Sequence, residues 1–213
     1  MRQQIAGVLI PDSPMAQAAR HCAEQAESEL LFKHSHRVFL FGMLSGVRQG
    51  ISVDGELFYV SALFHRIGLT DAYQRSQLRY EIDGANEARA FLQRFGVPAP
   101  SVQDVWDAIV LHTSPGIAVY KSGMAALLAR GVEADAIGLH LDEFTEAQKQ
   151  QVVAAYSRGQ RFKERIIEDL GAGMLHRPAS TFGTINADIL DRLDPDYRRI
   201  NYCGLILGAP WAD

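Results

Sequence analysis

The stretch Leu57-Phe58-Tyr59-Val60-Ser61-Ala62-Leu63-Phe64 decides the fold class of this chain. Every residue in it except Ser61 is apolar, so a helix made of it is apolar on nearly all sides, as is typical of a helix buried within a bundle. Asp54 can cap the start of this helix, and Gly68 is expected to end it. The sequence therefore predicts a central helix that other helices surround.

Helix start and stop signals recur on both sides of that segment. Ser13 before Pro14 predicts a helix through Glu29. A second helix is predicted from His34, with two glycines four residues apart where another helix can approach closely. The remaining predicted helices cover 84–95 after the cap Asp83, 101–112 from a capping box of Ser101 and Asp104, 122–130, 132–138, 145–156 from a capping box of Thr145 and Gln148, 162–170, and a short segment near Ala187. Alternating strand patterns are nearly absent, so the predicted fold is all-α.

The length of 213 residues and the absence of a low-complexity linker predict one compact helical domain over 1–213. The tail over about 187–213 is expected to be irregular and apolar apart from the short helix near Ala187, and its apolar end, 204–211, is expected to pack back on the body. Whether that tail also closes a homodimer stays open at this point.

Composition limits the classes of partner. Lys and Arg number 21 against 25 Asp and Glu, a net charge of −4 that argues against a dedicated nucleic-acid binder. No apolar run is long enough to span a membrane. Cys22 and Cys203 lie far apart and form no CxxC pair, so we expect buried, reduced cysteines and a cytoplasmic location. The remaining expected partner is a small molecule.

Three histidines are the candidate functional residues. His34 lies at the start of the second predicted helix, His65 in the last turn of the most buried helix, and His112 at the end of another helix. Helical bundles build metal sites from imidazoles and carboxylates that project inward from different helices. The alternative is that each is a hydrogen-bonded core histidine. His36, two residues from His34, points in another direction on a helix and is expected at the surface or behind the site.

The sequence around these histidines resembles a known superfamily. His34-Ser35-His36-Arg37-Val38 and His65-Arg66-Ile67-Gly68-Leu69-Thr70 are similar to the first histidine and the His-Asp pair of the HD superfamily of metal-dependent hydrolases. The segments 80–85, 106–114, 116–118 and 161–163 are similar to its cyanamide hydratase branch. The resemblance spans about 31–186. It implies an all-α, HD-domain-like bundle around a divalent metal, zinc or iron, that activates water to attack a nitrile carbon.

The resemblance also implies residue roles. His34 matches the first metal ligand, His65 the histidine of the His-Asp pair, and Asp135 the late aspartate. His112 is then a further ligand or the group that handles the proton. One position departs from the pattern, because Arg66 stands where the superfamily has its aspartate.

The charge of Arg66 bears directly on metal binding. Two unit charges about 4 Å apart interact by about 4 kcal/mol at an effective dielectric constant of 20. Replacing a carboxylate ligand by a guanidinium therefore changes the free energy of metal binding by something on the order of 10 kcal/mol if Arg66 faces the ion. Three outcomes stay open: Arg66 excludes the metal, turns its head to solvent, or takes the metal's place and pairs with Asp135.

Three functions follow from these outcomes. The first is a metal-dependent hydratase or hydrolase with an altered metal site, acting on a small polar molecule. The alternative is a pseudoenzyme without a metal that binds a small anion through Arg66. The third, suggested by the broader superfamily alone, is a nucleotide phosphohydrolase, which would need a phosphate-binding cluster that the motifs do not display.

Overall fold

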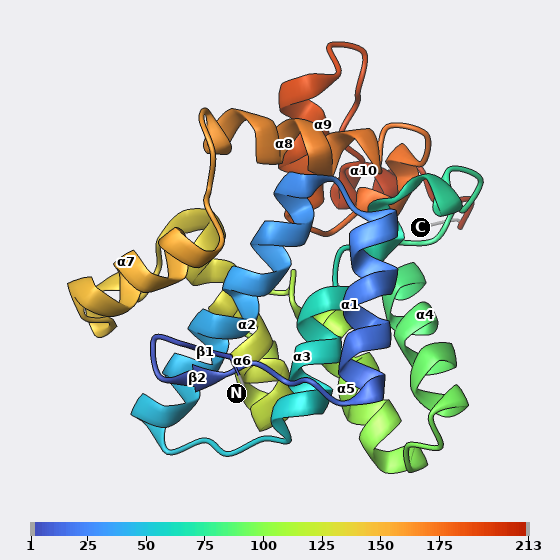
Figure 1. Ribbon diagram of the computed structural model, residues 1–213. Helices are drawn as coiled ribbons and strands as arrows, with labels where there is room; N and C mark the ends of the chain where they lie inside the picture. The colour runs from blue at the N-terminus through green and yellow to red at the C-terminus, as the bar shows by residue number, and fades with distance from the viewer. Residues whose placement is uncertain (1–2, 212–213) are drawn as a thin grey trace.

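The computed structural model describes residues 3–211, and α-helices make up most of that range (Figure 1). The predicted all-α fold is confirmed. The helices are α1 (Pro14–Ala26), α2 (Glu29–Gln49), α3 (Gly55–Phe64), α4 (Tyr80–Arg94), α5 (Ala99–Leu111), α6 (Gly123–Ile137), α7 (Glu146–Ala155), α8 (Phe162–Ala172), α9 (Asn186–Leu193) and α10 (Tyr202–Leu207). Short 3₁₀ helices cover Ile67–Leu69, Asp71–Tyr73, Ala118–Tyr120, Leu141–Glu143 and Pro178–Thr181. A two-stranded antiparallel sheet, β1 (Gln4–Ile5) with β2 (Val8–Leu9), precedes them.

The predicted central helix is α3, which is buried from Phe58 to its end and packs beside α1, α2 and α5. The longest helix, α2, runs along α6 through glycine contacts. A Cβ added to Gly42 would lie 2.8 Å from the Leu127 carbonyl oxygen, and one added to Gly131 would lie 2.3 Å from that of Val38. These positions therefore need glycine because the two backbones approach so closely.

Several helix boundaries differ from the predicted ones. The second helix starts at Glu29 rather than His34, because Ser28 caps it by accepting a hydrogen bond from the Leu31 amide. Helix α4 starts at Tyr80, and Asp83 lies inside its first turn, paired with Arg177 instead of capping. Helix α5 starts at Ala99, directly after Pro98, so the predicted capping box at residue 101 does not form.

Helices α6 and α7 follow α5, and α7 agrees with the prediction whereas α6 differs from it. The two short helices predicted over 122–130 and 132–138 are the single helix α6, since Gly131 serves close packing and does not break the helix. The capping box of Thr145 and Gln148 is present at the start of α7, with both reciprocal hydrogen bonds formed.

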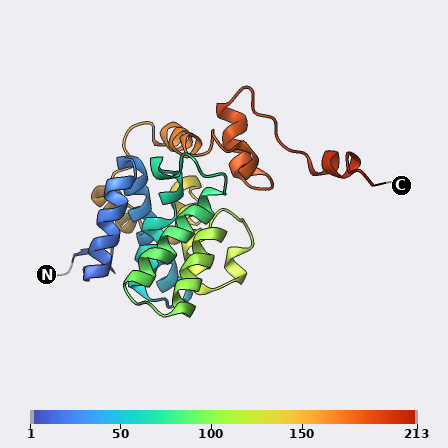
Figure 2. The same cartoon turned by 90° about the vertical axis from the view of Figure 1, so that its right-hand side faces the viewer.

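The C-terminal segment packs on the body only in its first part. The predicted helix near Ala187 is present as α9, and Ala187 and Leu190 are buried in a cluster with Leu69 and Tyr80. From residue 198 onward the chain, including α10, leads away from the bundle (Figure 2), so the prediction that the apolar end packs back is wrong. Residues 198–211 are exposed, including the apolar side chains of Leu207 and Trp211, which are 87% and 86% exposed. Cys22 and Cys203 are also exposed, so the prediction that both are buried is wrong.

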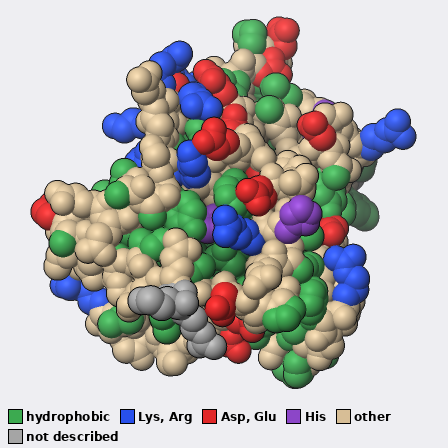
Figure 3. All heavy atoms as spheres, viewed as in Figure 1, with side chains coloured by type: hydrophobic (Ala, Val, Ile, Leu, Met, Phe, Trp, Pro, Cys, Tyr) green, Lys and Arg blue, Asp and Glu red, His purple; other side chains and the backbone are tan. Residues whose placement is uncertain are grey.

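Charges of both signs are interspersed on the face shown in Figure 3. Within residues 3–211, no helix combines the length and the apolar character that crossing a bilayer requires. The two ends of the predicted domain, residues 1–2 and 212–213, lie outside the described residues.

Candidate functional site

The fold brings together the three histidines singled out in the sequence. His34 projects from the second turn of α2, while His65 and His112 follow the last residues of α3 and α5. The ring centres of His34 and His65 are 5.3 Å apart, and those of His65 and His112 are 5.0 Å apart. All three side chains are buried. The cluster therefore joins three helices at the centre of the bundle.

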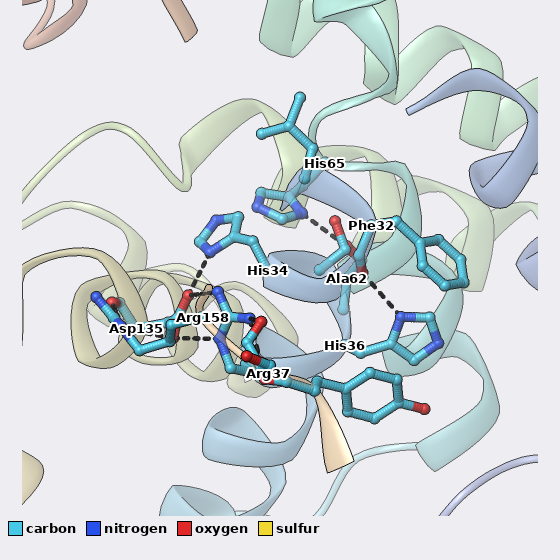
Figure 4. A network of polar contacts seen from close by, with 12 residues as sticks. Phe32, His34, His36, Arg37, Ala62, His65, Asp135 and Arg158 are labelled. Atoms are coloured by element: carbon cyan, nitrogen blue, oxygen red, sulfur yellow. Dashed lines mark hydrogen bonds and ion pairs between the residues drawn. The ribbon is translucent and has the colours of Figure 1, made fainter. Parts of the chain in front are cut away.

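The hydrogen bonds of these rings fix their tautomers. Nδ1 of His34 lies 2.6 Å from Asp135 Oδ2, Nδ1 of His65 lies 2.6 Å from the Ala62 carbonyl, and Nδ1 of His112 lies 2.5 Å from the Ile109 carbonyl (Figure 4 shows the first two). Because each partner is only an acceptor, each Nδ1 carries the hydrogen and each Nε2 presents a lone pair.

Two of the three Nε2 atoms have no partner among the described residues. These are Nε2 of His34 and Nε2 of His65. Nε2 of His112 differs, because it accepts a hydrogen bond from the Tyr80 hydroxyl at 3.2 Å. The cluster thus contains two bare, buried imidazole nitrogens.

The imidazoles are held in their neutral form. Burial lowers the pKa of His34 to about 4, and it lowers the pKa of His65 and of His112 well below the usual value. The second cause at His65 and at His112 is the positive charge of Arg66, which further disfavours protonation of the two rings. At neutral pH these rings therefore offer hydrogen-bond acceptors and carry no charge.

Asp135 is a buried carboxylate whose two oxygens are both occupied. Arg37 donates from Nε to Oδ1 at 2.7 Å and from Nη2 to Oδ2 at 2.9 Å, and Arg158 Nη1 donates to Oδ1 at 2.8 Å (Figure 4). Burial alone would raise the pKa of Asp135, but the hydrogen bonds from His34 and Arg37 outweigh it and hold the pKa below its ordinary value. The Phe162 ring lies against both guanidinium groups. Asp135 thus anchors α6 to α2 as a charged group.

The head group of Arg66 lies beside His65 and His112, so two of the three outcomes left open are excluded. It does not turn to solvent, because the residue is only 4% exposed. It does not pair with Asp135 either, since Arg37 and Arg158 hold that carboxylate. Its Nη1 donates to the Tyr80 hydroxyl, its guanidinium carbon lies 5.6 Å from the Tyr80 ring centre, and its Nε has no partner among the described residues.

No described carboxylate forms an ion pair with Arg66. The buried carboxyl group of Glu27 feels its charge, but burial is the larger effect and raises the pKa of Glu27 well above its usual value. Burial thus shifts Glu27 toward its neutral form, and the hydrogen bonds of its carboxyl group come from Ser35 rather than from Arg66. Arg66 is a buried cation without an acidic partner in the described part of the chain.

A cavity of about 930 Å³ reaches this cation. It lies between the second half of α6 and the helices α7, α8 and α9, and its lining includes Arg66, His112 and Thr113. His34 and His65 are absent from that lining and are fully buried. A molecule in the cavity therefore reaches Arg66 and His112 but not the two bare nitrogens.

Two residues of this region were missed in the sequence. Tyr80 links Arg66 to His112 through its hydroxyl. Glu81 is buried, and its Oε1 accepts hydrogen bonds from Thr113 at 2.5 Å and from Asn186 at 2.8 Å, while its Oε2 has no partner among the described residues. The available signal was that both residues lie in the segment 80–85, which is part of the family resemblance. Of the two places predicted for His36, the surface is excluded, because the residue is buried and its Nε2 lies 3.0 Å from the Tyr59 hydroxyl.

The residues present do not fit the divalent metal that the resemblance implies. The bare nitrogens of His34 and His65 are suitable donors, but both oxygens of Asp135 are engaged and the positive charge of Arg66 lies beside the rings. Within residues 3–211, no group of three or more His, Cys, Asp or Glu side chains is arranged to hold a metal ion.

Comparison with known proteins found no family whose sequence model matches this chain and no curated protein similar to it.

Proposed function

We propose that the cavity binds a small organic anion, a carboxylate or a phosphate, whose charged group contacts Arg66. The observation that carries this proposal is the buried guanidinium without an acidic partner in the lining of a cavity. Burying an unpaired charge costs several kcal/mol, and that cost is offset when an anion supplies the missing charge. The chain is then a binding or regulatory protein whose inherited hydratase site has changed its ligand.

The surroundings of Arg66 favour an oriented anion site. Nη1 of Arg66 donates to the Tyr80 hydroxyl, which donates to Nε2 of His112, whose Nδ1 donates to the Ile109 carbonyl. This chain of hydrogen bonds holds the guanidinium in place while Nε stays free. A planar guanidinium with free donors matches the geometry of a carboxylate or phosphate.

The first expected result is therefore a selective thermal shift. At a concentration a hundredfold above Kd, a bound anion stabilises the native state by about 2.7 kcal/mol, which raises Tm by roughly 5 to 10 °C in a chain of this size. Screening wild type and Arg66→Gln against small carboxylates and phosphates by differential scanning fluorimetry checks this. A shift of equal size in both proteins would contradict the proposal, since the stabilising anion would then act elsewhere.

A second candidate function is the metal-activated hydration or hydrolysis of a small polar molecule. The bare Nε2 atoms of His34 and His65 favour it, because buried imidazole nitrogens without partners are typical metal donors. It requires that Arg66 move away from the rings. The metal content of the wild-type protein separates the two candidates.

A further inference from the structure

We infer that the anion carries an aliphatic chain of medium length, as a medium-chain carboxylate does. This inference rests on the proposed anion site at Arg66 and adds the part of the ligand that lies beyond the charged group. It is carried by the walls of the cavity, which are apolar over most of their extent. The apolar walls include Val132 and Ala136 of α6, Val153 of α7, Ile166 and Leu170 of α8, and Ile189 of α9.

The apolar walls continue to the surface of the molecule. Ile137, Leu139 and Ile185 all line the cavity and are 70%, 45% and 45% exposed. Arg66, by contrast, is 4% exposed. The cavity thus runs from a buried cation to an apolar mouth. A ligand that matches it has its charge at the inner end and its hydrocarbon chain pointing outward.

The other cations of the lining do not compete for the charged group. Arg158 shares the Asp135 carboxylate with Arg37 and is 32% exposed, so water also solvates its charge, and Lys149 is paired with Glu146 at 2.5 Å. Lys163 is exposed, where water already solvates its charge. Arg66 is the buried cation of the lining that forms no ion pair with an acidic residue in the described part of the chain. A carboxylate therefore binds most favourably next to Arg66.

The size of the cavity also favours a ligand with a chain. Its volume of about 930 Å³ lies within the range of sites that enclose whole organic molecules. An acetate or phosphate ion at Arg66 would leave most of the apolar wall in contact with water. An aliphatic chain covers that wall, and each buried methylene should lower Kd about fourfold.

The test is a series of titrations on the full chain. Isothermal titration calorimetry with acetate, butyrate, hexanoate, octanoate and decanoate, each below its critical micelle concentration, measures Kd as a function of chain length. Decanol serves as the uncharged probe. Arg66→Gln removes the cation, Ile137→Gln makes the mouth polar, and Val47→Gln is the control for a polar substitution at an exposed apolar residue, being 81% exposed on α2 and outside the cavity lining.

The expected result has three parts. In wild type, Kd falls about fourfold per methylene until the chain reaches the mouth. Arg66→Gln weakens every carboxylate about tenfold or more, whereas Ile137→Gln weakens only the longest chains and Val47→Gln weakens none. Decanol binds far more weakly than decanoate.

Different outcomes overturn the inference and the proposed function. Short and long carboxylates that bind equally well, and only when Arg66 is present, would leave an anion site and overturn the aliphatic ligand. Long carboxylates that bind Arg66→Gln as tightly as wild type would overturn the anion site itself. If the chain sediments as a dimer and binds no carboxylate, a second copy fills the cavity and the inference fails.

Discussion

Asp135→Asn is expected to lower the free energy of unfolding by about 3 to 5 kcal/mol. The substitution removes the negative charge that Arg37 contacts through two hydrogen bonds, and both side chains are fully buried. A buried guanidinium that loses its partner is destabilising by that amount, because water cannot replace the lost charge. The new amide also places a donor against some of the donors from His34, Arg37 and Arg158. Urea denaturation of wild type and variant measures the loss.

The matched control is the same substitution at an exposed ion pair. Asp188 pairs with Arg199, and their side chains are 71% and 53% exposed. Because solvent screens such pairs, Asp188→Asn should change the unfolding free energy by less than about 1 kcal/mol. If Asp135→Asn were equally mild, Asp135 would not be the anchor described above and would be free to act as a ligand, as the family resemblance implies.

Stability should fall steeply between pH 6.5 and pH 4. Burial lowers the pKa of His34 and that of His36 from 6.5 to about 4. The unfolded chain takes up a proton near pH 6.5, while the native chain does so only near pH 4, so acid favours unfolding throughout that window. At about 1.4 kcal/mol per pKa unit, each of the two histidines accounts for roughly 3 kcal/mol.

Burial also lowers the pKa of His65 and of His112, so these two histidines likewise make the native state less stable as the pH falls. The combined loss is comparable with the whole stability of an ordinary domain, about 5 to 15 kcal/mol. Urea denaturation at half-unit pH intervals measures the slope. His36→Gln should flatten the slope by up to one proton, whereas His21→Gln, at an exposed position, should leave it unchanged. A stability that stays constant from pH 6.5 to pH 4 would show that the rings are not held neutral.

Individual helices could be predicted from the sequence where the residues that specify them lie close together in the chain. The apolar run at 57–64 and the capping box at 145–148 each specify a helix within a few residues. The errors arose where two local signals compete. The apolar and polar residues around Ser28 continue the pattern of the first predicted helix through Glu29, but Ser28 accepts a hydrogen bond from the Leu31 amide and begins the second helix. In the sequence, Gly131 predicts a break between two helices. In the structure it lies inside α6, where the close approach of the α2 backbone requires a glycine.

The site was predictable only in part, because several of its contacts join residues that lie far apart in the sequence. Metal ligand and core histidine, the two alternatives for His34, His65 and His112, both predict buried side chains. The direction of Arg66 depends on its neighbours, because its long stem can reach solvent or the interior. The pair of Arg37 with Asp135 joins residues 98 positions apart, and the cavity forms only once α7, α8 and α9 are placed. Such contacts leave no periodic pattern in the sequence.

We propose that Arg66 keeps a metal away from the histidine cluster and leaves the cavity to an anion. Elemental analysis of wild type and Arg66→Asp, both expressed with zinc, iron and manganese available and purified without chelator, tests it most directly. We expect wild type to contain far less than one metal ion per chain, and Arg66→Asp to approach one, because the new carboxylate joins the bare nitrogens of His34 and His65. One tightly bound metal ion per chain in wild type would contradict the account.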